Sequence, residues 1–439
     1  MIKKFSAVTV SKNDIAVFLS PKSYRQQLLQ LIAEAQSRIF ITALYLQDDE
    51  TGREILHALY QAKAERPQLD IKIFVDYHRA QRGLIGEKGS LGNRSLYLSL
   101  AEQYQQSIEI YGVAVKGKEL LGVLHLKGMV FDNVLFYTGA SINDVYLQKD
   151  TRYRLDRYYQ ISSEKLANSF CDYLQNIFVE SALCPLLNQV SLPDKPQQKR
   201  NVARLKALLK KSYYPISEAS EPSDITIQPL IGYGAHRNML NNAIRKMVQR
   251  SQQQILIFTP YFNIPKALVR DIIKALKRGV KITLVIGDKT ANDFYIANDA
   301  EFSTIGIVPY LYEVLLARFV KRWQKFIDSG LLDIRLWADQ DNSFHLKGVI
   351  VDERYHLLTG SNLNPRAWSL DLENGLLVDD PHGYLLAPLA EEKEVIFKNT
   401  RKVSHYGQLP NLKSYPEKPR KLLKKIQLTQ IDRILKRFL

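Results

Sequence analysis

The chain has 439 residues, 46% of them hydrophobic and 24% charged, a composition typical of a globular protein with two or three domains. Its 61 basic and 45 acidic side chains give a formal net charge of +16, which favours polyanionic partners such as nucleic acid, anionic lipid or phosphorylated substrates. Two cysteines, Cys171 and Cys184, are too few for a disulfide framework and match no metal site, so we expect free thiols in a reducing cytoplasm.

The N-terminal segment carries Lys3 and Lys4 but no apolar stretch behind them, so no signal peptide is predicted. Nowhere do about 18 apolar residues follow one another, and no membrane-spanning helix is expected. We therefore expect a protein that is soluble or lies on a membrane surface.

One order of elements occurs twice along the chain. Residues 37–46 form an apolar run typical of a buried strand, residues 54–59 have the spacing of an amphipathic helix, and residues 70–76 form a second buried strand. Tyr45 and Tyr261 occupy matching positions and are expected in the core. Strands that alternate with helices predict an α/β fold in which each half covers its own sheet. The second copy of this strand, helix and strand order lies at residues 253–262, 268–273 and 280–288.

Between the repeats lies a polar segment with prolines, in which basic residues and no acids occur from Lys199 to Lys211. This composition predicts a solvated linker with a basic helix. The expected parts are a first half at 1–187, the linker at 188–223, a second half at 224–400 and a basic tail at 401–439.

A His-x-Lys motif occurs once in each half, about 220 residues apart, at residues 125–127 and 345–347. Because alternate residues of a strand face the same way, we expect each histidine to point in the same direction as its lysine. The predicted catalytic residues are His125, Lys127, His345 and Lys347. The apolar neighbours that are expected to face the core are Leu124, Leu126, Val130, Phe344, Leu346 and Ile350.

Asp132 and Asp352 follow the two motifs at equal spacing. On a strand they have the opposite parity to the histidines, and each opens a turn. We therefore expect structural roles for both, in a turn or a salt bridge. Gly128 and Gly348 are expected to leave open space beside the lysines.

The paired motif suits phosphodiester chemistry. An imidazole can attack a phosphoryl group, and a lysine can neutralise the charge of a phosphodiester. Of two facing histidines, one serves as the nucleophile, while the other protonates the leaving group and later takes a proton from the acceptor. The lysines supply the positive charge that Mg²⁺ supplies elsewhere, so no metal or other cofactor is expected.

Polar segments at residues 138–143 and 359–364 end the next strand in each half and offer amide and hydroxyl donors to phosphate oxygens. The first reads Gly-Ala-Ser where the second reads Gly-Ser, which displaces the first hydroxyl by one residue. The predicted substrate-binding residues are Ser141, Asn143, Ser361 and Asn364.

A nucleophilic histidine also needs an acceptor at its far nitrogen, which fixes the tautomer. Glu373 and Asp156 begin the next strand in their halves and are the candidates for this role. For Asp156 the alternative is an ordinary ion pair with Arg154 or Arg157.

The duplicated HxKxxxxD pattern, with a glycine-serine-asparagine segment after each copy, resembles the phospholipase D superfamily from about Ser37 to Val378. This resemblance implies two similar α/β halves packed about a pseudo-twofold axis, with the active site at their junction. In that family the acidic residue at the position of Glu373 bonds the neighbouring histidine.

Three segments, at residues 75–83, 287–295 and 362–368, resemble the bacterial phosphatidylserine synthase branch. That branch converts CDP-diacylglycerol and L-serine to phosphatidylserine and CMP through a covalent phosphatidyl-histidine, with no required protein partner. By analogy with related enzymes, His125 is expected to be the nucleophile and His345 the acid/base.

The segment from Pro410 to Leu439 is strongly basic, and its apolar residues follow helical spacing. Such a helix can lie among the head groups of anionic lipid, or it can dock its apolar stripe on the enzyme body. With a substrate that carries two acyl chains, we expect a cytoplasmic protein bound peripherally to the inner face of the cell membrane.

Other functions remain open at this level. A cardiolipin synthase or a phospholipase D-type hydrolase uses the same motifs, and the net charge also suits a nuclease of the superfamily or non-specific polyanion binding without catalysis.

Overall fold

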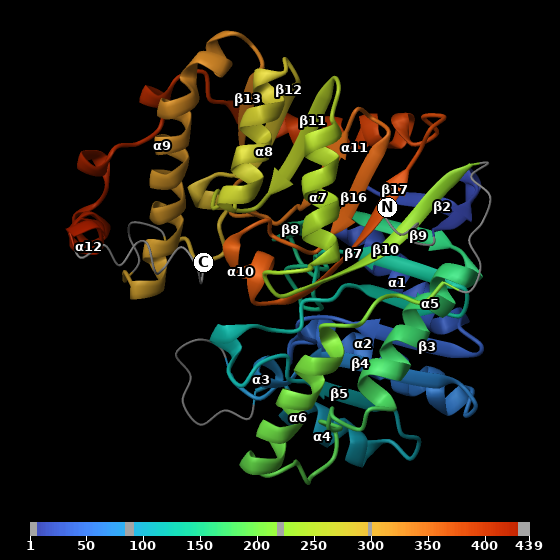
Figure 1. Ribbon diagram of the computed structural model, residues 1–439. Coiled ribbons are helices and arrows are strands. Elements are labelled where there is room, and N and C mark those ends of the chain that lie inside the picture. Colours follow the sequence, from blue (N-terminus) through green and yellow to red (C-terminus); the bar gives the residue numbers. More distant parts are fainter. Residues whose placement is uncertain (1–6, 84–91, 217–223, 297–300, 429–439) are drawn as a thin grey trace.

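The structure, a computed structural model, describes residues 7–83, 92–216, 224–296 and 301–428, and its two halves stack one above the other in Figure 1. Each half is a mixed sheet with helices against it, and the two sheets repeat one topology. The predicted α/β fold with two similar halves is therefore confirmed.

The sheet of the first half has the order β2-β9-β7-β6-β3-β4-β5, in which β3, β4 and β5 are parallel and the others antiparallel to their neighbours. The strands are β2 (Ile15–Phe18), β3 (Arg38–Thr42), β4 (Asp70–Asp76), β5 (Glu109–Val113), β6 (Gly128–Phe131), β7 (Val134–Thr138) and β9 (Tyr158–Ser162).

The sheet of the second half has the order β1-β10-β17-β16-β15-β11-β12-β13-β18. Its segment from β17 to β13 repeats the segment from β9 to β5, with the same directions. The strands are β1 (Val8–Val10), β10 (Ile225–Tyr233), β11 (Gln254–Thr259), β12 (Lys281–Gly287), β13 (Leu332–Trp337), β15 (Gly348–Val351), β16 (Tyr355–Thr359), β17 (Leu372–Asp379) and β18 (Thr400–Lys402).

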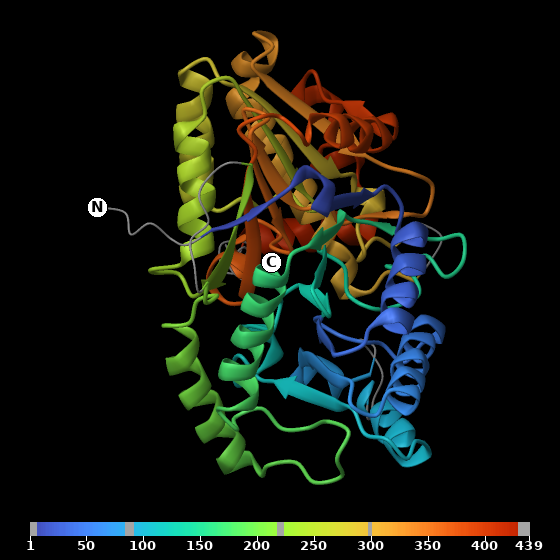
Figure 2. The ribbon, with the colours of Figure 1, turned by 90° about the vertical axis from the view of Figure 1, so that its right-hand side faces the viewer.

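Helices cover both faces of the first-half sheet: α1 and α2 lie on one side, and α5 and α6 lie on the other (Figure 2). In the second half, α7 and α8 pack side by side against the sheet. The helices are α1 (Pro21–Glu34), α2 (Glu50–Glu65), α3 (Tyr77–Ala80), α4 (Arg94–Gln103), α5 (Glu164–Leu174), α6 (Lys195–Leu209), α7 (Met239–Arg250), α8 (Lys266–Lys277), α9 (Val308–Asp328), α10 (Pro365–Ser369), α11 (Leu386–Lys398) and α12 (Glu417–Leu428). Among the helices of these ranges, none has both the length and the hydrophobicity that a bilayer crossing requires.

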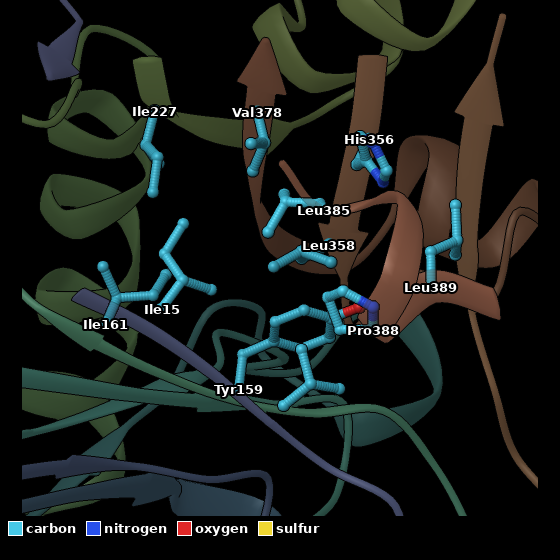
Figure 3. Close-up of a pocket in the computed structure, with 11 residues that line it drawn as sticks. Ile15, Tyr159, Ile161, Ile227, His356, Leu358, Val378, Leu385, Pro388 and Leu389 are labelled. Carbon is cyan, nitrogen blue, oxygen red and sulfur yellow. The ribbon is translucent and has the colours of Figure 1, made fainter. Parts of the chain in front are cut away.

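The two sheets share one hydrophobic core at the junction. In Figure 3, Ile15, Tyr159 and Ile161 of the first half face Ile227, Leu358 and Val378 of the second. The cavity that they line measures only about 10 Å³, so the side chains pack closely. This continuous core fixes the position of one half relative to the other.

The chain crosses the expected boundaries at two points, and the expected linker contains a packed helix. Strand β1 pairs with β10, so residues 8–10 join the sheet of the second half, and β18 extends that sheet across the boundary at 400/401. Within the expected linker, α6 packs Leu205 and Leu209 into the core that the two halves share, while its basic side chains are exposed. Residues 217–223 of that linker lie outside the described residues.

The tail forms α12, and its apolar side packs on the enzyme body. Leu423 and Ile426 are buried together with Tyr415 against residues at the start of α9, while the lysines of α12 face outward. Of the two alternatives for the tail, the described part therefore adopts the docked one, whereas residues 429–439 lie outside the described residues.

Candidate active site at the junction of the halves

The two motifs meet because each motif segment pairs with a strand of the opposite half. The His125 amide donates to the Leu372 carbonyl, and the His345 amide donates to the Leu155 carbonyl, both at 2.9 Å. The second contact extends a two-stranded parallel ladder between β8 (Arg154–Leu155) and β14 (Ser343–Phe344), and Figure 1 shows β8 at the junction. This exchange brings both histidines to the seam.

The first histidine is held by a carboxylate from the other half. Nδ1 of His125 lies 3.0 Å from Oε1 and 2.9 Å from Oε2 of Glu373. With the Nδ1 proton donated to Glu373, the Nε2 lone pair is left for a substrate. Burial raises the pKa of Glu373 to about 8, against the opposing effect of Lys127. Burial, together with the Lys127 charge, lowers the pKa of His125, which keeps the imidazole neutral.

The second histidine has a more crowded environment. Asp156 Oδ2 lies 3.4 Å from Nδ1 of His345, and it also accepts a hydrogen bond of 2.9 Å from Nζ of Lys347. Lys347 Nζ contacts His345 Nδ1 as well, and the Tyr146 hydroxyl lies 3.0 Å from the same nitrogen. Burial lowers the pKa of His345, and the charge of Lys347 acts in the same direction.

The alternative of an ordinary ion pair for Asp156 is wrong. Arg154 pairs with Asp293 and Arg157 pairs with Glu392, and the contact that Asp156 makes to Arg157 is a hydrogen bond from the backbone amide. The carboxylate of Asp156 instead contacts His345 and Lys347 of the second motif.

Lys127 reaches across the junction and is 1% exposed. A Cβ added to Gly360 of the second half would lie 2.6 Å from Lys127 Cγ. Within the described residues the Lys127 ammonium has no hydrogen-bond partner, and burial lowers the pKa of this lysine to about 7. An unsatisfied buried ammonium beside the Glu373 and Asp156 carboxylates of the two motifs is suited to binding an anionic oxygen.

The side-chain oxygens of the two predicted asparagines cap local turns. Asn143 Oδ1 accepts from the amide of Tyr146 and Asn364 Oδ1 from that of Ala367, each at 2.9 Å. Ser361 is buried, and its hydroxyl has no hydrogen-bond partner among the described residues. Ser141 is also buried. Substrate binding by these four residues stays a prediction.

Asp132 and Asp352 hold equivalent turns, both with a positive φ, and lie away from the histidines. Each carboxylate accepts three backbone amide hydrogen bonds, from residues 36–38 and 252–254 respectively, at 2.8–3.1 Å. Both contacts fasten the start of a central strand to the turn that follows the motif strand.

Replacement of Asp132 by alanine should lower the free energy of unfolding by about 1–2 kcal/mol, because partly exposed amides lose their acceptor. Turnover should change less than twofold, since this turn lies outside the site. Thermal unfolding and steady-state kinetics of the purified variant measure both. Asp352→Ala is the matched variant in the second half; a large loss of turnover in either one, with the melting temperature preserved, would contradict a structural role.

The expectation of open space at Gly128 and Gly348 is wrong. Their φ angles are +114° and +151°, and an added Cβ would lie 2.8 Å from the Phe170 ring or from the Leu357 carbonyl oxygen. These glycines are required by backbone conformation and close packing.

Sequence reasoning missed the residues that hold the backbone of the first motif. Asp76 accepts from the Leu124 amide at 2.9 Å, and Asp371 accepts from the Val123 amide at 3.0 Å. Asn374 is fully buried and bonds both the amide and the carbonyl of Lys127. Two signals were available in the sequence. Asp76 ends a buried strand, and Asp371 and Asn374 lie on either side of Glu373.

Comparisons with known proteins place this geometry in a family. The sequence model described as "Cardiolipin synthase, PLD-like domain" matches residues 28–177 and 244–401. The CDP-diacylglycerol–serine O-phosphatidyltransferase PssA of Escherichia coli is 41% identical over 98% of this chain and 96% of its own length, and the Haemophilus influenzae enzyme of that name is 42% identical over 96% and 93%. The crystal structure of phosphatidylserine synthase from Haemophilus influenzae superposes with a TM-score of 0.96 at 39% identity, covering 99% of this chain and 98% of that one. The chain therefore belongs to the phospholipase D-like family, in the branch that contains these two bacterial phosphatidyltransferases.

Proposed function

We propose that this protein is a CDP-diacylglycerol–serine O-phosphatidyltransferase that works through a covalent phosphatidyl-histidine. The observation that carries the proposal is the pair of buried imidazoles, each facing a carboxylate from the opposite half at Nδ1. The near full-length similarity to two bacterial enzymes of that name supplies the substrates.

In the first step, Nε2 of His125 attacks the phosphorus that bears the diacylglycerol group, an N–P bond forms, and the P–O bond to CMP breaks. In the second step, the hydroxyl of L-serine attacks the same phosphorus, its proton passes to His345, and the N–P bond to His125 breaks. The ammonium groups of Lys127 and Lys347 neutralise the phosphoryl oxygens in both transition states.

A single set of incubations tests the proposal. The protein is supplied with CDP-diacylglycerol in detergent micelles, with and without L-serine, and separately with DNA, and CMP and phosphatidylserine are quantified. We expect serine-dependent release of CMP with one phosphatidylserine formed per CMP. Serine-independent CMP release with phosphatidic acid as product would identify a hydrolase, and DNA cleavage without CMP release would reject the assignment.

We further propose that the outward face of α12 binds anionic lipid head groups reversibly. The supporting observation is that Lys418, Lys421 and Lys424 are exposed on the docked helix, while its apolar side is occupied by packing. Attraction of this kind is worth about 1 kcal/mol per basic residue near an anionic surface and is screened by salt.

Reversal of these three lysines to glutamate should lower binding to vesicles that contain phosphatidylglycerol by at least about tenfold at low salt. Sedimentation with the vesicles measures the bound fraction. The matched control reverses three exposed basic residues of α6, Lys199, Arg200 and Arg204, which makes the same change of net charge elsewhere. Equal losses in both variants would mean that total charge, rather than α12, is responsible.

A further inference from the structure

A largely buried ion pair joins the two halves beside the second histidine. Nη2 of Arg154, on β8, lies 2.9 Å from Oδ1 of Asp293, in the loop after β12, and the two side chains are only 14% and 18% exposed. Although burial disfavours its charge, the Asp293 carboxylate keeps the pKa of Arg154 well above its usual range. Burial acts against Asp293 in the same way, but Arg154 and His345 hold the pKa of this carboxyl below its usual value. Both groups are therefore charged.

Tyrosines connect the ion pair to the imidazole of His345. The Arg154 guanidinium lies 4.4 Å from the centre of the Tyr146 ring, and the hydroxyl of Tyr146 lies 3.0 Å from His345 Nδ1. Tyr261 donates to Asp293 Oδ2 at 3.3 Å, and its ring stands edge-on to the His345 ring with centroids 6.2 Å apart. The pair thus lies one side chain away from the group that handles the acceptor proton in the proposed reaction.

The ion pair also retains unused hydrogen-bonding capacity. Beyond the 2.9 Å contact between Nη2 of Arg154 and Oδ1 of Asp293, the buried atoms Arg154 Nε and Asp293 Oδ1 have no further hydrogen-bond partner within the described residues. Buried charged groups are normally fully hydrogen-bonded, because an unmet donor or acceptor destabilises the fold. Such groups beside a reaction centre are typical of a ligand site.

A carboxylate is unfavourable next to a phosphodiester, because the two negative charges repel each other. Asp293 is therefore better suited to contact a cationic group near His345 than the phosphodiester of the nucleotide substrate. Arg154 offers the complementary charge to an anionic group at the same place. Adjacent opposite charges match a ligand whose ammonium and carboxylate are attached to one carbon atom.

We propose that Arg154 and Asp293 form the acceptor subsite and recognise a small zwitterionic hydroxy amino acid. This inference rests on the proposed function and extends it to the residues that select the acceptor. The ammonium binds Asp293, the carboxylate binds Arg154, and the hydroxyl points to the phosphorus. When that hydroxyl attacks, its oxygen bonds to phosphorus, the bond from phosphorus to His125 breaks, and the proton moves to His345.

The test separates acceptor binding from the first chemical step. Exchange of labelled CMP into CDP-diacylglycerol requires only the nucleophile and the nucleotide, whereas phosphatidylserine synthesis also requires the acceptor. In Asp293→Asn we expect the KM for L-serine to rise about 10- to 100-fold, the effect of losing one charge-assisted hydrogen bond. This fold-rise should be at least ten times larger than any fold-loss in the rate of CMP exchange. The matched control is Glu392→Gln, which removes the carboxylate of a different inter-half pair, formed with Arg157, and should leave the KM within twofold.

Acceptor analogues supply an independent readout. Ethanolamine lacks the carboxylate, so Arg154→Met should reduce the preference for L-serine over ethanolamine at least tenfold. A serine KM that Asp293→Asn leaves unchanged, or a loss of CMP exchange equal to the loss of synthesis, would overturn the subsite. If the wild-type protein released no CMP, the proposed function would fail. Saturation-transfer NMR of L-serine with the wild-type protein and Asp293→Asn would then still decide whether this pair binds the zwitterion.

Discussion

Asparagine in place of His125 should abolish both phosphatidylserine synthesis and CMP exchange, lowering turnover by at least about 10⁴-fold. The reason is the arrangement at Nδ1: Glu373 contacts it with both oxygens, which fixes one tautomer and leaves the Nε2 lone pair for attack in the proposed reaction. In the proposed reaction, loss of this nitrogen removes the group on which the covalent intermediate forms. Quantification of CMP and of phosphatidylserine measures the effect.

The contrasting variant is His345→Asn. The phosphate of CMP is a good leaving group that needs little protonation, whereas the acceptor hydroxyl must lose its proton. His345→Asn should therefore still form the phosphatidyl-enzyme and accumulate it in the presence of L-serine. Each variant is incubated with CDP-diacylglycerol labelled in the phosphatidyl phosphate and is then quenched in acid. The His345→Asn protein should carry the label, and the His125→Asn protein should carry none. The opposite distribution of label would reverse the two roles.

The elements nearest the site were largely predictable because they carry local signals. Two apolar runs in each half predicted the central parallel strands, and duplication of the motif located both histidines. The parity argument also succeeded: Leu124 and Leu126 are fully buried in the core behind His125, and Phe344 and Leu346 are buried behind His345. Such signals lie within a few residues, so a single sequence contains them.

The pairings that cross the junction were not predictable in the same way. Glu373 and Asp156 could be named as carboxylates at strand starts, but each bonds the histidine of the opposite half, some 190–250 residues away. That exchange depends on how the two sheets pack, which no local pattern encodes. The same holds for β1, whose three residues join the sheet of the second half, and for the contact between Tyr146 and His345.

Tyr45 and Tyr261 illustrate where burial alone misleads. They were expected in the core, and both are indeed less than 10% exposed. Yet the Tyr261 ring stands against His345, and Arg79 lies over the ring of Tyr45. An active site enclosed between two halves is lined by buried residues, so burial cannot distinguish a core residue from one that shapes the site.

Replacement of Lys127 by methionine should lower kcat/KM by about 10²- to 10³-fold, the usual cost of losing one group that stabilises a developing negative charge. Methionine has a similar length and no charge, so packing against Gly360 is largely retained. Equal activity in Lys127→Met and wild type would exclude a role for this ammonium in binding the phosphoryl group.

The pH dependence tests the same residue independently. Burial lowers the pKa of Lys127 to about 7 and raises that of Glu373 to about 8. The active form needs Lys127 protonated and Glu373 ionised, so one proton must be present on the pair, and it must lie on the lysine. Wild-type kcat/KM should therefore be bell-shaped, falling below about pH 7 as both groups become protonated and above about pH 8 as the shared proton is lost. In Lys127→Met the alkaline fall should disappear while the acid limb remains, because only Glu373 then needs to ionise; an unchanged alkaline limb would assign it to another group.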